Sequence, residues 1–128
     1  MIREVAQIGL DNEMDLILAH KRAMKIAELC GLSLSAQTSF ATAVSEIARC
    51  AIVHGSNSSL SLGIQFLRGG RKDILAVLTD DINLQAQGAE ALSYAKRLLG
   101  EVTIEGRGKG CEVTMSQKIP YPGTISDA

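Results

Sequence analysis

The stretch AVSEIARCAIVHG, residues 43–55, decides the fold, because it is the densest helical pattern in the chain. Apolar residues recur in and just before it at the spacing of an amphipathic helix, at Phe40, Val44, Ile47, Ala48, Ala51 and Ile52. Each helical residue advances by about 100°, so the opposite side of this helix carries Glu46, Arg49 and Cys50. The sequence therefore predicts a helix that buries one face, presents chemically active groups on the other and ends at Gly55.

Composition describes one globular domain with an aliphatic core. The chain has 128 residues, of which 46% are hydrophobic and only 3% aromatic. A formal net charge of −1 gives no reason to expect a nucleic acid or an anionic membrane as partner. Three separated cysteines without a CxxC pair suggest neither a disulfide framework nor a zinc site. We therefore expect no bound metal, no nucleic-acid or membrane partner, and a cytoplasmic location with reduced thiols.

The remaining periodicities predict two more helices and five strands around this helix, which we expect to start from a cap at Ser35. One helix is capped by Asp11 or Asn12 and runs through residue 30, and the other spans residues 89–99. The strands span residues 3–10, 60–67, 73–79, 101–105 and 111–119.

The order of these elements limits the architecture. Strand 3–10 is weakly patterned and reads as an edge strand, whereas strand 73–79 is almost wholly apolar and reads as a central one. The order β-α-α-β-β-α-β-β contains two hairpins, which an all-parallel sheet cannot accommodate. We predict an α+β two-layer sandwich, in which a mixed, mostly antiparallel five-stranded sheet carries three helices on one face.

The end of the chain is predicted to lie outside this domain. Pro120 and Pro122 would stop the last strand, because proline cannot donate to a strand ladder. We assign residues 1–119 to the domain and residues 120–128 to a tail or a linker.

Four segments, taken in order, resemble a known superfamily. They are SEIARCAIVHG (45–55), RGGRKDILAVLTDD (68–81), LSYAKRLLGEVTI (92–104) and GRGKGCEVTMSQKI (106–119). Their order and spacing resemble the histidine-kinase-like ATPase superfamily, often called GHKL, over nearly the whole chain. Within it the sequence is similar to the small bacterial serine kinases of the anti-sigma-factor and stressosome-switch group. The resemblance implies the histidine-kinase-like ATPase fold and a site descended from one for ATP and Mg²⁺.

The resemblance implies roles for three positions, and Arg49 lies beside two of them on the same helix face. Glu46 matches a glutamate that helps to activate the attacking group, and Asp80 matches an aspartate that accepts from the adenine amino group. Cys50 stands where the superfamily has an asparagine ligand for Mg²⁺, and a soft thiol is a poor replacement for a hard oxygen ligand. Glu46 is therefore a vestigial catalytic candidate, and Arg49, Cys50 and Asp80 are vestigial cofactor-binding candidates.

The glycines of the superfamily's nucleotide motif are missing. Ile82 and Leu84 stand in their place, and their side chains would fill the space beside a nucleotide. The lid segment QGAEAL (87–92) keeps only Gly88 and places Glu90 where phosphates would lie.

The residues themselves also allow a structural interpretation, which we prefer. Asp80 would satisfy nearby backbone donors, as loop aspartates often do. Glu46 and Arg49 would form an exposed pair one helical turn apart.

Two functions follow from this resemblance. The first is a degenerate ATPase-like domain that serves as a regulatory or protein-interaction module in bacterial signal transduction. It would act on a protein partner, or as the N-terminal part of a sensor kinase or phosphatase, and would need no cofactor and have no catalytic activity by itself. The second is an ATP-binding, Mg²⁺-dependent serine/threonine protein kinase of the anti-sigma type. The loop 80–91 favours the first function.

Two further expectations concern association and redox chemistry. An uncovered sheet face and the edge strand 3–10 favour a homodimer or a contact with another chain. A redox role for Cys50 has little support, because no second cysteine lies nearby in the sequence to resolve an oxidised thiol.

Overall fold

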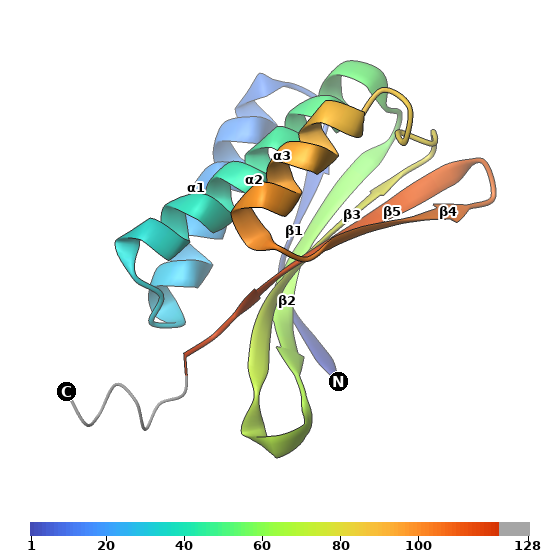
Figure 1. Cartoon of the computed structure of the whole chain (residues 1–128). Coiled ribbons are helices and arrows are strands. Elements are labelled where there is room, and N and C mark those ends of the chain that lie inside the picture. Colours follow the sequence, from blue (N-terminus) through green and yellow to red (C-terminus); the bar gives the residue numbers. More distant parts are fainter. Residues whose placement is uncertain (121–128) are drawn as a thin grey trace.

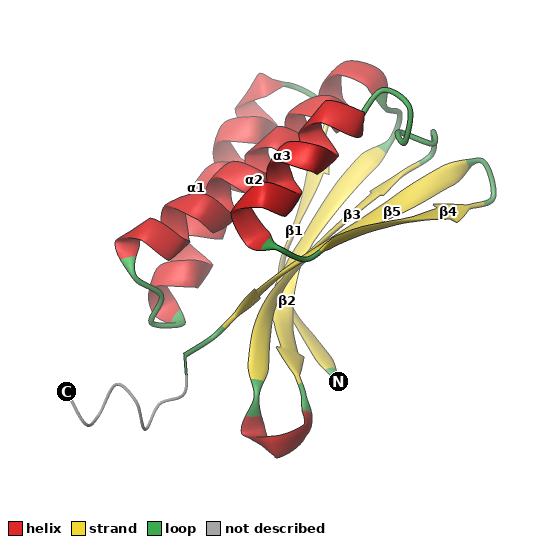
Figure 2. Ribbon diagram, viewed as in Figure 1, coloured by secondary structure: helices red, strands yellow, loops and turns green. Residues whose placement is uncertain are grey.

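A computed structural model describes residues 1–120 of the chain. Three helices lie on one face of a five-stranded sheet, and no helix covers the other face (Figures 1 and 2). The elements are β1 (Ile2–Leu10), α1 (Glu13–Leu29), α2 (Leu34–His54), β2 (Ser58–Phe66), η1 (Arg68–Gly70), β3 (Lys72–Asp80), α3 (Ala89–Leu99), β4 (Val102–Arg107) and β5 (Gly110–Lys118). The predicted α+β two-layer sandwich is confirmed. The predicted tail falls almost entirely on residues 121–128, outside the described part of the chain.

The strands are ordered β1-β2-β3-β5-β4, so β1 is an edge strand and β3 is the central one, as predicted. All four pairings between the described strands are antiparallel, and the predicted mixed sheet contains no parallel pair. Parallel pairs are absent because of the way the last hairpin, β4 and β5, joins the sheet. After α3 the chain returns as β4 in the same direction as β3, but β5 folds back into the place between them.

Helix α2 occupies the middle of the helical layer, between α1 and α3 (Figure 1). Its apolar stripe is buried as the periodicity predicts, at Phe40, Ala41, Ala43, Val44, Ile47, Ala48 and Ala51. The helix starts one half-turn earlier than expected, because the cap is Ser33 and not Ser35. The side chain of Ser33 accepts a hydrogen bond of 3.2 Å from the backbone N–H of Ala36.

Helix α1 is capped by Asn12, one of the two residues that the sequence allowed. Its side chain accepts from the N–H groups of Met14 and Asp15, and the Asp15 carboxylate accepts from the Asn12 N–H in a capping box. Helical spacing places Ile17 with the apolar stripe of this helix, yet its side chain is 51% exposed. It lies on the flank of the outermost helix, where no described element packs against it.

The core lies between the helices and one face of the sheet. The strands contribute aliphatic side chains that are at most 2% exposed, at Leu60, Leu62, Ile74, Leu78, Val113 and Met115. Successive strand residues point to opposite faces, so the neighbours of these residues form the helix-free face. That face carries many hydroxyl and carboxylate groups, such as Ser61, whose hydroxyl donates to Glu4 over 2.7 Å.

The edge strand β1 is less regular and more exposed than the inner strands. The ladder between β1 and β2 shifts register between Glu4 and Ala6, as at a β-bulge. Two apolar side chains of β1 remain largely exposed, Ile2 at 58% and Val5 at 59%.

None of the helices within residues 1–120 has the length and the apolar composition of a membrane span.

The two phenylalanines of the chain test how far the core depends on α2. Phe40 is fully buried, whereas Phe66 is 36% exposed and only packs its ring under the Lys72 ammonium group, 5.8 Å from the ring centroid. We expect Phe40→Ala to lower the free energy of unfolding by about 3–5 kcal/mol. Phe66→Ala should lower it by about 1 kcal/mol. Urea denaturation followed by circular dichroism measures both, and equal losses would show that α2 is not packed as described.

Candidate functional site

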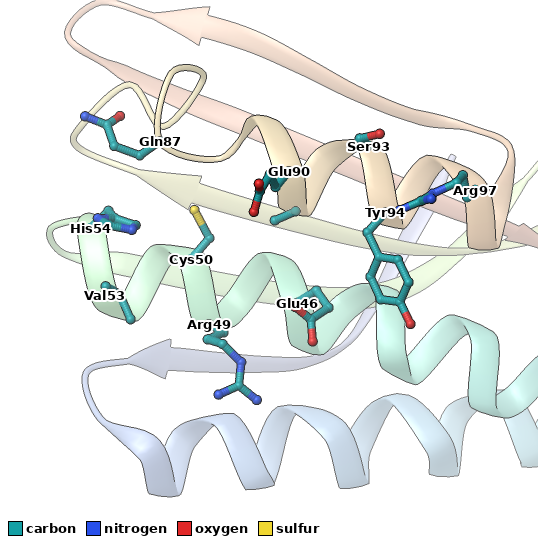
Figure 3. Close-up of a pocket in the computed structure, with 11 residues that line it drawn as sticks. Glu46, Arg49, Cys50, Val53, His54, Gln87, Glu90, Ser93, Tyr94 and Arg97 are labelled. Carbon is teal, nitrogen blue, oxygen red and sulfur yellow. The ribbon is translucent and has the colours of Figure 1, made fainter.

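A cavity with a volume of about 580 Å³ lies between α2 and α3. From α2 it is lined by Glu46, Arg49, Cys50, Val53 and His54, and from α3 by Glu90, Ser93, Tyr94 and Arg97 (Figure 3). Both sets repeat at three- and four-residue spacing, so each helix turns one polar stripe toward the cavity while its apolar stripe packs on the sheet. The face of α2 predicted from the sequence is therefore the wall of this cavity.

The charges around the cavity are not paired with one another. Two ion pairs occur within residues 1–120, Lys25–Glu28 and Arg107–Glu112, and both lie elsewhere. The expected surface pair of Glu46 and Arg49 is not formed. The Arg97 guanidinium group instead lies 5.6 Å from the centroid of the Tyr94 ring, a cation–π contact within its own helix. The side chains of the cavity therefore keep their hydrogen-bonding capacity for another molecule.

Cys50 lies where the loop before α3 crosses α2. A Cβ atom on Gly88 would lie 3.3 Å from the Cys50 sulfur and 2.7 Å from the Leu84 carbonyl oxygen, so only glycine fits at this crossing. Burial raises the pKa of the Cys50 thiol, and the nearby side chains of Asp80 and Cys111 raise it further. The thiol is thus protonated at neutral pH, which makes it a weak nucleophile and a weak metal ligand. The described residues contain no cluster of three or more metal-binding side chains.

Asp80 does not line this cavity, although the resemblance groups it with Glu46 and Cys50. Its side chain is 5% exposed and accepts hydrogen bonds from three groups of its own chain. They are the Ser56 N–H at 3.1 Å, the Ile82 N–H at 2.7 Å and the Ser58 hydroxyl. A Cβ atom on Gly55 would collide with the Asp80 carboxylate, so the closing glycine of α2 is needed for this close approach.

The two residues that replace the motif glycines lie in different environments. Leu84 is 3% exposed and joins the hydrophobic core, whereas Ile82 is 41% exposed. Of the two side chains that we expected to fill the space next to Asp80, Leu84 is therefore the one that is buried.

Several cavity residues were missed in the sequence, among them His54, Tyr94 and Arg97. The sequence showed no basic residue near the start of α3 before Lys96, but α2 supplies Arg49 and His54 from across the cavity, and α3 supplies Arg97. A signal was present in the spacing of Glu90, Tyr94 and Arg97, which share one face of α3. The spacing alone does not show that these side chains line a cavity, because this depends on how α3 packs against α2.

Comparisons with known proteins find similarity in structure only. No model of a protein family matches the sequence, and no curated protein matches it. The chain is similar to a structure of the RsbU and RsbW domains of Rv1364c from Mycobacterium tuberculosis, with a TM-score of 0.68 and 16% identity over 95% of this chain and 33% of that one. It is also similar to the histidine kinase domain of a blue-light activated histidine kinase from Erythrobacter litoralis EL346, with a TM-score of 0.52 and 16% identity over 81% of this chain and 61% of that one.

These similarities establish the class of fold. The chain has the histidine-kinase-like ATPase fold that the sequence motifs predict, and it spans about a third of the first similar chain and three fifths of the second.

The carboxylate of Asp80 can be tested against that of its neighbour Asp81. Asp81 is exposed and accepts one hydrogen bond, from the Asn57 side chain at 3.2 Å. Asp80→Ala leaves buried donors without a partner, so we expect it to lower the free energy of unfolding by about 3 kcal/mol. Asp81→Ala should cost about 0.5 kcal/mol. Thermal and urea denaturation measure both, and an Asp80→Ala protein as stable as its Asp81→Ala counterpart would refute the structural role.

Proposed function

We propose that this domain is a degenerate histidine-kinase-like ATPase that serves as a regulatory, protein-binding module in bacterial signal transduction. It would act in the cytoplasm on a regulatory protein, or as one domain of a longer sensor kinase or phosphatase. The fold supports this, because this chain matches only 33% of one similar chain and 61% of the other, which is the histidine kinase domain of a light-activated kinase. The observation that carries the proposal is the engagement of Asp80 by its own chain.

An adenine ring needs a carboxylate with a free acceptor that faces the nucleotide. Asp80 already accepts from Ser56, Ser58 and Ile82 and stands apart from the α2–α3 cavity. To bind adenine it would have to leave buried donors unpaired, which costs about 1–3 kcal/mol for each group. Leu84 adds a steric obstacle on the loop that would have to move.

The phosphate and metal end of a nucleotide fits no better. Cys50 offers a protonated thiol where Mg²⁺ requires an oxygen ligand. Glu90 lies in the first turn of α3, where a negative side chain repels phosphate. These residues argue against ATP and Mg²⁺ as cofactors of this domain.

The same cavity is better suited to a protein surface. Its unpaired carboxylates and guanidinium groups stand beside Tyr94, which is 38% exposed. Tyrosine and arginine are enriched where proteins bind one another. Exposed apolar side chains on the edge strand β1 also support association, as a homodimer or with another chain, and we propose neither nucleic acid nor membrane as a partner.

The alternative function is an ATP-binding serine/threonine kinase of the anti-sigma type. One observation favours it: Glu46, the candidate that would activate the attacking hydroxyl group, lines a cavity of a size common for small-molecule ligands. This alternative requires the loop before α3 to rearrange, so that Asp80 and Glu46 face the same ligand.

Calorimetric titration with ATP, with and without Mg²⁺, separates the two functions. Each lost charge-assisted contact weakens binding by about 1.5–3 kcal/mol, so a micromolar site becomes millimolar or weaker. We expect no saturable heat with up to about 1 mM Mg²⁺-ATP.

Cys50→Asn is the matched variant for this titration. It restores the hard ligand but leaves Leu84 and the engaged Asp80 in place, so binding should remain absent. A dissociation constant in the low micromolar range for the unmodified domain would establish the kinase alternative instead.

A further inference from the structure

The helix-free face of the sheet contains a buried carboxylate without a partner. Asp73 lies near the start of the central strand β3, opposite Gln65 of β2 and Lys118 of β5. Its side chain is only 9% exposed, and its Oδ1 atom has no hydrogen-bond or ion-pair partner within residues 1–120. Buried polar atoms are nearly always paired in folded proteins, so an unpaired one requires an explanation.

Asp73 lies in the wall of a cavity of about 460 Å³ on this face. The apolar side chains of Leu75 and Val77, which point the same way along β3, form part of the lining. The hydroxyl groups of Thr114 and Ser116 stand beside them on β5. The cavity has the size of a small-molecule site and lies on the side of the sheet away from the α2–α3 cavity, so it is independent of the function proposed above.

The charges around this second cavity favour a positive ligand. Glu101 and Glu112 line it together with Asp73, whereas Arg71 is the one basic residue of the described lining. The Glu112 carboxylate is already paired with Arg107, at 3.2 Å, and Glu101 is exposed to solvent, so Asp73 is the buried carboxylate of the lining that still lacks a partner. Burying an unpaired carboxylate costs free energy in the free domain. A cation that pairs with the carboxylate offsets part of this cost, which favours binding.

The chemistry of the lining favours a guanidinium group over other cations. A guanidinium ion is planar and weakly hydrated, so it loses less on leaving water than an ammonium ion does, and it lies well against apolar surfaces such as Leu75 and Val77. Its several N–H donors match the carboxylate and the hydroxyl groups of Thr114 and Ser116. A metal ion is disfavoured, because the described residues offer no cluster of three metal-binding side chains.

Arg71 and Lys118 are the competing partners within the chain itself. Arg71 lies two residues before Asp73, lines the same cavity and is exposed, and Lys118 stands directly opposite Asp73 on β5. Neither residue forms an ion pair with Asp73. Because χ2 of an aspartate rotates easily, its unpaired oxygen can turn toward a ligand that enters the cavity.

We propose that the helix-free face of the sheet binds a guanidinium group, with Asp73 as its anchor. The group would come either from a free small molecule or from an arginine side chain of a partner protein.

Titrations of the ¹⁵N-labelled domain, followed by NMR, test this proposal and distinguish the two sources. The probes are agmatine, a blocked Gly-Arg-Gly peptide and the same peptide with citrulline in place of arginine. We expect saturable shifts of the amides of Asp73, Leu75, Thr114 and Ser116, with dissociation constants on the order of millimolar. Saturation by agmatine and the arginine peptide alike identifies a site for free small molecules, and saturation by the peptide alone identifies an arginine side chain. No saturation with either, or equal shifts with citrulline, would refute the proposal.

Two variants complete the test. Asp73→Asn should weaken binding at least about ten-fold, whereas Glu105→Gln, which removes an exposed carboxylate outside the cavity lining on the edge strand β4, should leave it unchanged. Asp73→Asn should also raise the melting temperature of the free domain by a few degrees, because it removes an unpaired buried charge.

Arg71→Gln and Lys118→Gln distinguish an external ligand from an internal partner. If Arg71 or Lys118 pairs with Asp73 in solution, its glutamine variant and Asp73→Asn will both lower the melting temperature, and the proposed site is wrong. If the site is open, neither glutamine variant changes the melting temperature, and binding is at least as strong as before.

Discussion

The hydrogen bonds to one buried carboxylate, that of Asp80, hold together the end of the molecule where four segments meet. They reach Ser56, two residues beyond the end of α2, the start of β2 and the loop that leads to α3, while Asp80 itself ends β3. A backbone hydrogen bond of 3.0 Å from Asp81 to Ser56 reinforces the same junction. The position of the central helix on the sheet depends on this junction, and so does the shape of the cavity between α2 and α3.

The central strand carries two buried aspartates, one near each end, in opposite situations. Asp80 is surrounded by donors of its own chain, and Asp73 has an oxygen without any within the described residues. The first arrangement is what a structural carboxylate requires, because every acceptor is used inside the fold. The second arrangement lowers the stability of the domain, and the rest of the fold compensates for it. Such unfavourable local arrangements are common at binding sites.

Most of the fold could be predicted from the sequence, because it depends on local periodicity. The stripe of α2, the edge position of β1 and the central position of β3 all follow from patterns within one element. The absence of parallel strand pairs in the sheet could not be predicted in the same way. It arises because β5 folds between β3 and β4, which run in the same direction. Likewise, Ser33 and Ser35 are equally good caps, and only the packing of the first turn of α2 separates them.

Only the α2 wall of the cavity between α2 and α3 could be predicted from the sequence. Helical spacing by itself places Glu46, Arg49 and Cys50 on one face, but Arg97 joins them through the packing of α3 against α2. Two of the three partners of Asp80, Ser56 and Ser58, lie more than twenty residues earlier in the chain, so no local pattern reveals them. In the sequence Asp73 is an ordinary residue at a hairpin, because burial on the helix-free face follows from the twist of the whole sheet rather than from alternation along one strand.

The pairing of β1 with β2 has a consequence for how the chain reaches its folded state. The ladder joins residues as distant as Ile2 and Gln65, with both α1 and α2 between them, whereas β2 and β3 or β4 and β5 meet across short turns. Contacts at such separation form slowly, because a long loop must close before they contribute. During folding, β2 therefore has an open edge until the first strand of the chain arrives, and its backbone donors and acceptors on that side stay exposed to solvent until then.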